Sequence, residues 1–318
     1  MDHIDINALA RAYAASKGGI DRIQVSHPAT RADSVTVLIP RNISAGIRAR
    51  VGGISYTNLD LTDIGADIRI AGGVADIRHV GLASSFGTAA LALRYDSSDI
   101  EALRASGSLA LKDIDITGFF RKFPSILRMA PEMKNLTGYL GLTADFKAGI
   151  FPDMAVNVPS ADVGMHLSGR SLVLRLSRFI RRITRMMLIR SAAPIHIADL
   201  DINASIHDNL LQLYPFDFEF DRYKLHMLGV NNMNGRLYYH MAVEESPVHI
   251  PFAINIEGMF SHTKLRFGDV NYDIRRGEEI TERDQQEESF NLVRLARDFM
   301  GMFIKTGAEY SDSGRRIR

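Results

Sequence analysis

The segment Asp199-Leu200-Asp201-Ile202-Asn203-Ala204-Ser205-Ile206 alternates polar with apolar residues at a period of two. This period is typical of a β-strand that buries one face. Five further alternating segments follow before residue 274, and polar turns separate them, beginning with His207-Asp208-Asn209. Six strands joined by short turns predict an antiparallel meander with one apolar face and one polar face.

The apolar face of this meander is the candidate ligand-lining surface. Its side chains alternate strictly with charged or amide residues, so we expect them to converge on one concave surface and to leave the convex face wet. Such a face must be covered by a second layer, by helices or by bound acyl chains. The residues expected to line it are Leu200, Ile202, Phe216, Phe218, Leu237, Tyr239, Phe252 and Ile254.

The strand-rich pattern also extends upstream of residue 195, where glycine pairs punctuate the turns. Helix-like segments at 8–15, 118–133, 178–190 and 290–305 are expected to be peripheral covers. The upstream strands are predicted at Ser34–Ile39, Gly46–Val51, Ile54–Leu61, Ala66–Ala71, Ala75–Val80 and Ala89–Tyr95.

A degenerate repeat organises the chain. The motif Ile4-Asp5-Ile6-Asn7 returns 110 residues later as Ile114-Asp115-Ile116-Thr117. We therefore expect a mainly β fold with peripheral helices: a long curved antiparallel sheet built from strand–helix–meander repeats. Because the motif begins near the first residue, the sequence is interpreted as the C-terminal part of a longer protein. The predicted units are a first curved repeat (1–111), a second repeat with the meander (112–274), and a charged linker, amphipathic helix and disordered tail (275–318).

Composition narrows the class of protein. The 318 residues suffice for a sizeable core, and the net charge of +1 means that an electrostatic partner must meet a local patch. Without cysteine there is neither a disulfide nor a thiolate metal site. Cysteine usage therefore does not distinguish an oxidising from a reducing compartment. No apolar run is long enough for a membrane-spanning helix, and no signal peptide is visible.

Catalytic motifs are missing from the sequence. There is no HExxH, no GxSxG and no GxGxxG, and the ten histidines are scattered over different predicted strands. Metal ligands could come together only across strands. The pair Asp113 and Asp115, like Asp199 and Asp201, lies at i and i+2 on the wet face of a strand, where solvation explains it. We therefore expect no enzyme activity, no cofactor and no catalytic or metal-binding residues.

One segment is strongly basic. Residues 164–198 contain seven arginines and no acidic residue. In the helix predicted from residue 178, Phe179, Ile180, Ile183 and Met187 share a face, and the arginines occupy the other. This helix is interpreted either as a solvated cap over the sheet or as a contact with anionic lipid headgroups. Nucleic acid fits poorly, because few aromatic residues accompany the charge. The candidate membrane-contact residues are Arg178, Arg181, Arg182 and Arg185.

With these features in order, the chain resembles the AsmA-like family of bacterial envelope proteins, especially the C-terminal region of Bacteroidota members. The resemblance covers most of the chain and is strongest at residues 170–272. It rests on the Ile4 and Ile114 repeats, on the segment from Leu200 to Leu213, and on Pro215-Phe216 followed by Asp221-Arg222-Tyr223. These motifs identify the architecture better than the activity, because none of them is catalytic.

The resemblance implies a periplasmic body folded like a taco shell around an apolar groove, with an inner-membrane anchor that is expected to lie outside this sequence. It implies a place in outer-membrane biogenesis and lipid homeostasis, and kinship with bridge-like lipid transfer proteins. The expected function is therefore non-enzymatic binding or conduction of phospholipid or another envelope lipid, with a membrane surface and envelope proteins as partners. The alternative is a structural or protein-interaction module of the envelope with a closed core and no lipid cargo.

Overall fold

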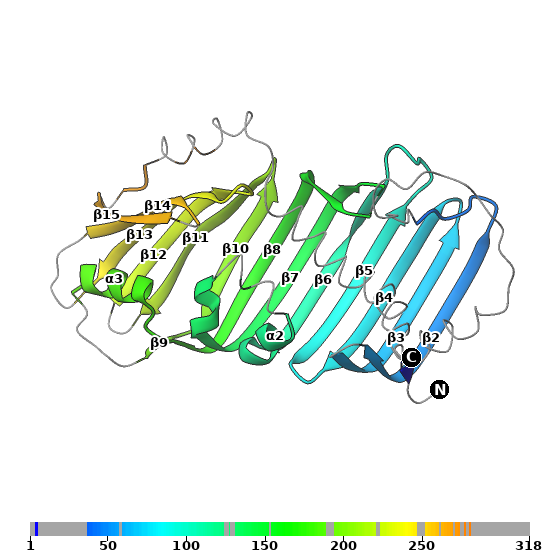
Figure 1. Ribbon diagram of the computed structural model, residues 1–318, viewed down its shortest axis with the longest axis horizontal. Coiled ribbons are helices and arrows are strands. Elements are labelled where there is room, and N and C mark those ends of the chain that lie inside the picture. The colour runs from blue at the N-terminus through cyan, green and yellow to red at the C-terminus, as the bar shows by residue number, and fades with distance from the viewer. Residues whose placement is uncertain are drawn as a thin grey trace, which may run out of the picture.

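The computed structural model shows one continuous sheet whose strands follow one another in chain order (Figure 1). Strand β1 pairs with β2 in parallel, and all other pairs are antiparallel. The structure describes residues 4–5, 37–56, 59–123, 127, 131–152, 154–188, 194–220, 223–246, 252–260, 262–269, 271–273, 277 and 280.

The N-terminal part of the sheet contains long strands that neighbour one another along the sequence. From β2 to β6, and again from β7 to β8, adjacent strands form hairpins with short connections, whereas α2 and η3 lie between β6 and β7. The strands are β1 Ile4–Asp5, β2 Ser44–Tyr56, β3 Leu59–Ala71, β4 Val74–Ser84, β5 Gly87–Asp96, β6 Arg104–Asp115, β7 Leu136–Ile150 and β8 Val156–Leu174.

The C-terminal part continues the same sheet with shorter strands. The short β9 pairs with both β8 and β11, while β10 joins the main path beside β8. The predicted six-strand meander is confirmed as β10 to β15. The strands are β9 Ile195–Ile197, β10 Leu200–His207, β11 Leu210–Phe220, β12 Tyr223–Asn232, β13 Arg236–Glu245, β14 Phe252–Met259 and β15 His262–Gly268.

The predicted turn after β10 also has the expected chemistry. Asp208 and Asn209 have φ angles of 48° and 65°, so both central residues of the two-residue hairpin adopt the left-handed conformation. This is the geometry of a type I′ turn, in which asparagine and aspartate are tolerated because their short polar side chains accept positive φ.

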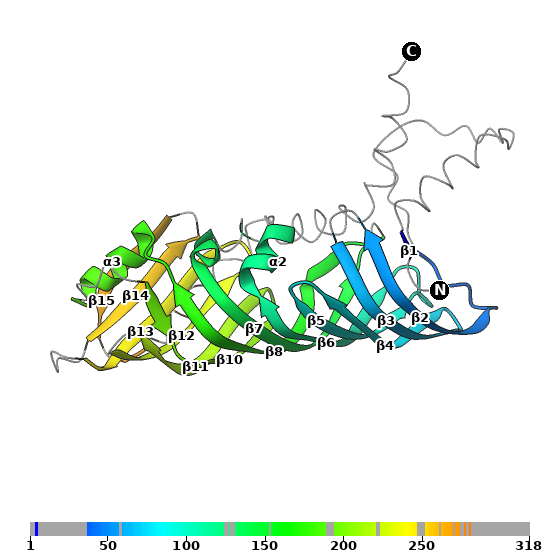
Figure 2. The same ribbon diagram turned by 90° about the horizontal axis from the view of Figure 1, so that it is seen from below.

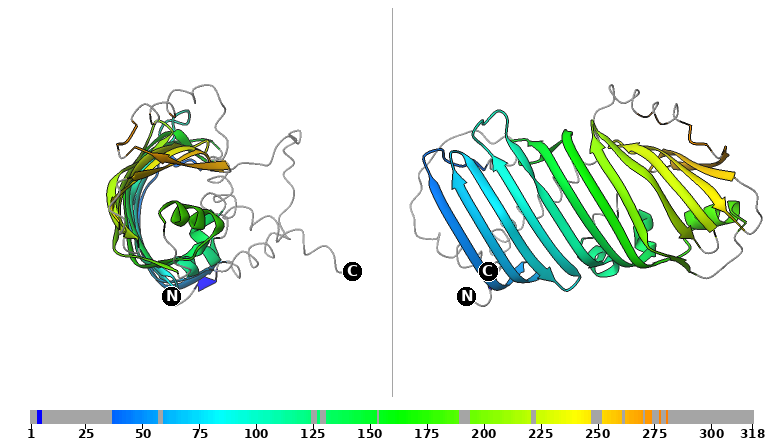
Figure 3. Two further views of the ribbon diagram at one scale, coloured as in Figure 1. Left: turned by 90° about the vertical axis from the view of Figure 1, so that its left-hand side faces the viewer. Right: turned by 180° about the vertical axis from the view of Figure 1, so that it is seen from behind.

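The sheet curves strongly about its long axis (Figure 3, left). Two helices, α2 (Ile116–Lys122) and α3 (Arg178–Met186), lie within the curve, near the rim of the trough (Figures 2 and 3). A 3₁₀-helix, η3, spans Pro131–Asn135 before β7. The predicted long curved antiparallel sheet with peripheral helices is therefore confirmed.

Several predicted boundaries are wrong. The strand predicted at Ile54–Leu61 spans the end of β2 and the start of β3, because Tyr56 pairs with Leu59 across a two-residue connection. Residues 37–39, predicted to end a strand, lie outside any element, and residues 34–36 lie outside the described chain. The first error arose because the two connecting residues, Thr57 and Asn58, include no glycine or proline that would mark a turn.

The helices are shorter than predicted. The helix predicted at 118–133 is α2 alone, followed by the separate η3, because Pro124 disfavours helical geometry at the preceding Phe123. The helix predicted at 178–190 ends at Met186. The helices predicted at 8–15 and 290–305, and the tail at the C-terminus, lie outside the described residues.

The two copies of the repeat motif occupy different strand pairings. Ile4 belongs to the two-residue β1, which pairs in parallel with Ile54 of β2. Ile114 lies near the end of β6, which pairs antiparallel with β7 and leads directly into α2. The continuation after the first copy lies outside the described residues.

The buried apolar core lies at the C-terminal end of the sheet, between α3 and the concave face of the strands. From α3, Ile180 and Ile183 pack together with Leu225 of β12, Leu237 of β13 and Ile254 of β14. We call this group the α3 core. Its full membership is Ile180, Ile183, Met187, Ile195, Phe220, Tyr223, Leu225, Leu237, Met241, Val243, Ile254, Ile256 and Leu265.

The convex face of this region is also buried, which corrects the expectation of a wet convex face. Tyr238 and His240 alternate with the concave-facing residues of β13, yet they are only 2% and 1% exposed. The ring of Tyr272 lies against both, with centroid distances of 5.4 Å to Tyr238 and 6.0 Å to His240. The Asn255 side-chain oxygen lies 2.8 Å from Nδ1 of His240. The chain that follows β15 therefore supplies a second cover.

Candidate functional site

The concave face carries an uninterrupted line of apolar side chains across the sheet. In an antiparallel pair, residues directly opposite each other share a face, so the register identifies the line without ambiguity. We call it the apolar row. It runs from β2 to β15 through Ala49, Ala66, Val80, Leu91, Leu109, Ala144, Met165, Ala204, Leu213, Gly229, Tyr239, Ile256 and Leu265.

A second line runs parallel to the apolar row on the same face. It is likewise free of charged or amide side chains from β2 to β11. Its members are Ile47, Ile68, Ile77, Leu93, Gly107, Phe146, Val163, Ile206 and Leu211. Together the two lines make the concave face a continuous apolar strip.

The length of this strip follows from the strand count. The apolar row crosses thirteen strands on the main path of the sheet. At about 4.8 Å per strand, it spans roughly 58 Å. One leaflet of a bilayer has a hydrocarbon depth of about 15 Å, half of the usual core. The strip is therefore several acyl chains long.

Exposure divides the strip into two parts. In the middle of β5 to β8, the concave-facing Leu91, Leu109, Phe146 and Met165 all remain partly exposed. At the C-terminal end, the equivalent side chains belong to the α3 core, where Ile254 is completely buried. Among the described residues, the short α2 packs on β6 and β7, and the 3₁₀-helix η3 also contacts β7.

At the rim of the trough, α2 carries an aromatic cluster. The ring of Phe86, from the turn between β4 and β5, lies 5.7 Å from Phe119 and 5.9 Å from Phe123 in edge-on geometry. The carboxylate of Asp115 caps α2 by accepting hydrogen bonds from the backbone N–H groups of Thr117 and Gly118. The aromatic cluster holds α2 against the strand ends at the rim of the trough.

The convex face of the N-terminal part is polar. In one line across the strands, Arg94 lies 3.2 Å from Asp76, and Lys147 lies 2.7 Å from Asp162. The hydrogen bond and charge of Lys147 hold the pKa of Asp162 below its usual value. Because these pairs are exposed, they stabilise the fold little. They show that the apolar face is directed inward.

All eight predicted lining residues share the concave face, as the register shows. Leu237 and Ile254 belong to the α3 core, and Phe218, Tyr239 and Phe252 pack against it. Ile202 is buried, whereas Leu200 and Phe216 remain partly exposed. Most of the predicted lining residues therefore lie where α3 covers the strip.

The partly exposed section of the strip was absent from the predicted lining residues. Its signal was present in Leu91 and Leu93 of β5 and in Leu109 and Leu111 of β6, which alternate with alanine and serine and have a charged neighbour only at Arg94 and Lys112. Small residues on the other face weaken the period-two pattern. The pairing of each strand with its neighbours, and not the strand alone, reveals the strip.

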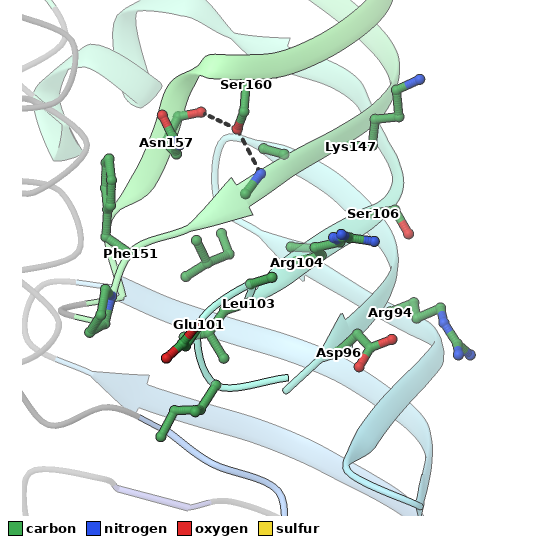
Figure 4. A pocket seen from close by; sticks show the side chains of 17 residues that line it. Arg94, Asp96, Glu101, Leu103, Arg104, Ser106, Lys147, Phe151, Asn157 and Ser160 are labelled. Carbon is green, nitrogen blue, oxygen red and sulfur yellow. Dashed lines mark hydrogen bonds between the residues drawn. The ribbon is translucent and has the colours of Figure 1, made fainter. Parts of the chain in front are cut away.

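A cavity of about 630 Å³ lies at the strand ends of β5 to β8 (Figure 4). Phe151 lies at one side of it, and Arg94 and Lys147 lie at the other. Arg94 and Lys147 already form the cross-strand pairs described above. Hydrogen bonds from the side chain and backbone of Ser98 keep the pKa of Asp96 low. Arg94, Asp96 and Lys147 are thus engaged in local contacts rather than aimed at a common point.

On the convex face, Asp217, His226 and Glu244 form the one cluster of potential metal ligands found in the described chain, with ligand atoms within 4.8 Å of one another. Asp217 lies 2.6 Å from Nδ1 of His226, and the Lys224 ammonium lies 3.5 Å from Glu244. The lysine charge opposes a bound cation. Two cross-strand pairs account for the cluster.

The four candidate membrane-contact arginines are all exposed on α3: Arg178, Arg181, Arg182 and Arg185.

No protein-family model, curated protein or solved structure matches the chain. Within the described ranges, none of the helices has the length and apolar content needed to cross a bilayer.

Proposed function

We propose that the chain binds lipid acyl chains along the partly exposed section of the apolar strip and acts as a non-enzymatic lipid-binding or lipid-conducting protein. The observation that carries this proposal is the apolar row, which crosses the whole sheet without a charged side chain. Single-layer sheets normally keep one apolar face against a second layer. Here the described chain covers that face fully only at the α3 core.

The energetics favour an acyl chain as the occupant. Removing apolar surface from water stabilises by about 25 cal/mol per Å², or about 0.8 kcal/mol per methylene. An acyl chain laid along Leu91, Leu109 and Met165 would bury surface on both partners. The charged pairs of the convex face leave only the concave side for such a ligand.

The resemblance to AsmA-like envelope proteins is consistent with this proposal. It supports phospholipid or another envelope lipid as the cargo, a periplasmic setting beside the inner membrane, and a role in outer-membrane biogenesis. These assignments form part of the proposal.

Native mass spectrometry of the purified chain tests lipid binding. Neighbouring positions on opposite faces of β6 provide a matched pair: Leu109 belongs to the apolar row, and the exposed Ser108 points to the convex side. We expect Leu109→Asp to lower the fraction of protein that carries lipid, and Ser108→Asp to leave it unchanged. Near-ultraviolet circular dichroism of both variants checks that the sheet remains folded.

The α3 core supports a second candidate, a structural or protein-interaction module without cargo. It shows that one end of the strip is filled by side chains of the protein itself. Under this alternative, the wild-type chain carries no lipid and takes up none from phospholipid vesicles. That result would contradict the lipid-binding proposal and favour the module.

A further inference from the structure

The exposed face of α3 concentrates positive charge at the C-terminal end of the trough. The side chains of Arg178, Arg181, Arg182 and Arg185 all point away from the core, while Ile180 and Ile183 are buried beneath them. None of the four arginines forms an ion pair within the described chain. Some exposed arginines elsewhere differ, since Arg48, Arg94 and Arg266 each face a carboxylate.

The helix is held rigidly, so the charge is presented in a fixed direction. Ser177 caps its first turn by accepting a hydrogen bond from the backbone N–H of Ile180 at 3.1 Å. At the other end, the buried hydroxyl of Tyr223 donates to the backbone carbonyl of Met187 at 2.8 Å. Four cations that have no ion-pair partner among the described residues, all on one face of a fixed helix, are an arrangement suited to an anionic surface.

Apolar side chains are exposed at the same end. Leu188, which follows α3 with a φ of 60°, is 64% exposed. Phe267 of β15 is also 64% exposed, and its ring lies 6.1 Å from that of Phe252, which packs against the α3 core. Arginines beside exposed leucine and phenylalanine match the boundary between lipid headgroups and acyl chains.

We infer that α3 docks the C-terminal end of the sheet on an anionic phospholipid bilayer. Arg178, Arg181, Arg182 and Arg185 contact lipid phosphates, and Leu188 enters the interfacial layer. A nucleic acid fits less well, because single-stranded sites stack bases on aromatic rings, and Phe179, the one aromatic side chain of α3, packs against the core. This inference goes beyond the lipid-binding proposal and does not require a loaded groove.

Vesicle flotation of the full chain tests the docking. The probes are vesicles of phosphatidylcholine alone and of phosphatidylcholine mixed with phosphatidylglycerol. The test variant changes Arg178, Arg181, Arg182 and Arg185 to Gln. The control variant changes Arg48, Arg50, Arg69 and Arg78 to Gln, which removes the same charge from exposed positions at the other end of the sheet.

We expect the wild type and the control variant to float with the anionic vesicles at about 0.1 M salt and to be released at about 1 M, where the Debye length falls from roughly 10 Å to 3 Å. The test variant should bind roughly a hundredfold to a thousandfold more weakly. Replacing the same four arginines by lysine should retain most of the binding, and Leu188→Asp should weaken the binding at the lower salt concentration.

Equal binding by the test and control variants, or no flotation of the wild type, would overturn the inference. A wild type that does not bind vesicles but binds single-stranded nucleic acid through the same arginines would overturn the inference in favour of nucleic acid. Native mass spectrometry separates this result from the groove proposal, because the α3 variants should carry as much lipid as the wild type.

Discussion

The two ends of the sheet use the same alternating pattern and the same face, but they satisfy that face differently. From β11 to β15, α3 covers the concave side, and Tyr272 lies on the convex side. From β2 to β8, no described helix closes the middle of the concave face, where residues such as Leu109 stay partly exposed. Apolar residues on one face are thus necessary for a core, but a covering element decides whether that core is closed.

This difference separates stability from binding. The α3 core is built like the interior of an ordinary two-layer domain, so it can stabilise the sheet without a ligand. The N-terminal part has long hairpins and many backbone hydrogen bonds but little fully buried apolar surface. Its strands rely on their neighbours, as in repeat proteins. We therefore expect the closed end to anchor the fold and the partly exposed section to bind.

The largest expected effect compares one substitution in the two parts. Ile254→Ala empties a completely buried site in the α3 core, whereas Ile68→Ala trims a partly exposed residue on the same face of β3. We expect Ile254→Ala to lower the free energy of unfolding by about 2–5 kcal/mol, and Ile68→Ala by about 1 kcal/mol. Urea titration of delipidated protein measures both.

Similar losses at the two sites would mean that the N-terminal face is as well packed as the α3 core, which removes the basis for the comparison. Repeating the titration with bound lipid sharpens the comparison between the two parts of the sheet. A ligand that binds only the folded state raises the free energy of unfolding by mass action. Lipid should stabilise the wild type, and it should stabilise Ile68→Ala less than Ile254→Ala.

The second effect concerns the convex cover. Tyr272→Ala removes the ring that lies against Tyr238 and His240 and exposes two otherwise buried side chains. We expect a loss of about 1–3 kcal/mol from lost apolar burial and aromatic contact. Thermal unfolding followed by circular dichroism gives the value. The control is Tyr214→Ala on the exposed side of β11, where the loss should be small; equal losses would show that Tyr272 covers nothing essential.

The sequence predicted the fold because each strand of the meander carries its own signal. Alternation at Leu200 to Ile206 and the polar turn at Asp208 and Asn209 are local features, and both were predicted correctly. The helix ends were harder, since α2 ends just before Pro124, inside a segment that looks helical on both sides of the proline. The buried convex face could not be predicted, because it depends on Tyr272 packing across three strands onto Tyr238, which is a long-range contact.

The candidate site was predicted in part for a related reason. The arginines of α3 form a local pattern, so their common exposed face followed from helical periodicity. The eight lining residues were correctly placed on one face, yet their burial depends on where α3 packs. Only tertiary structure shows that α3 closes the strip over Ile254 and leaves it partly exposed near Leu109.

The third effect is a dependence on alkaline pH. Burial raises the pKa of Tyr239 and also that of Tyr272. Above about pH 10 the unfolded chain releases tyrosine protons that the folded chain retains, so stability falls as pH rises. For Tyr239 the expected slope is about 1.4 kcal/mol per pH unit from pH 10 upward. Tyr239→Phe should flatten the slope, although it loses the hydrogen bond to Asn231 at neutral pH. An unchanged slope between about pH 9 and pH 11 would contradict this role.

The smallest expected effect uses the two helix caps, one in each part. Ser177→Ala removes the cap of α3, and Asp115→Ala removes the cap of α2. Each should cost about 1 kcal/mol, because a backbone N–H loses its partner.

The two losses of stability should nevertheless spread to different parts of the sheet. Since α3 closes a core shared with β13 and β14, Ser177→Ala should accelerate hydrogen exchange in those strands as well as in the helix. Asp115→Ala should accelerate it only in α2 and the adjoining ends of β6 and β7, because no closed core depends on that helix. If Ser177→Ala affects α3 alone, the strands of the C-terminal part hold together without their cover, and the contrast between the two parts lies in exposure rather than in stability.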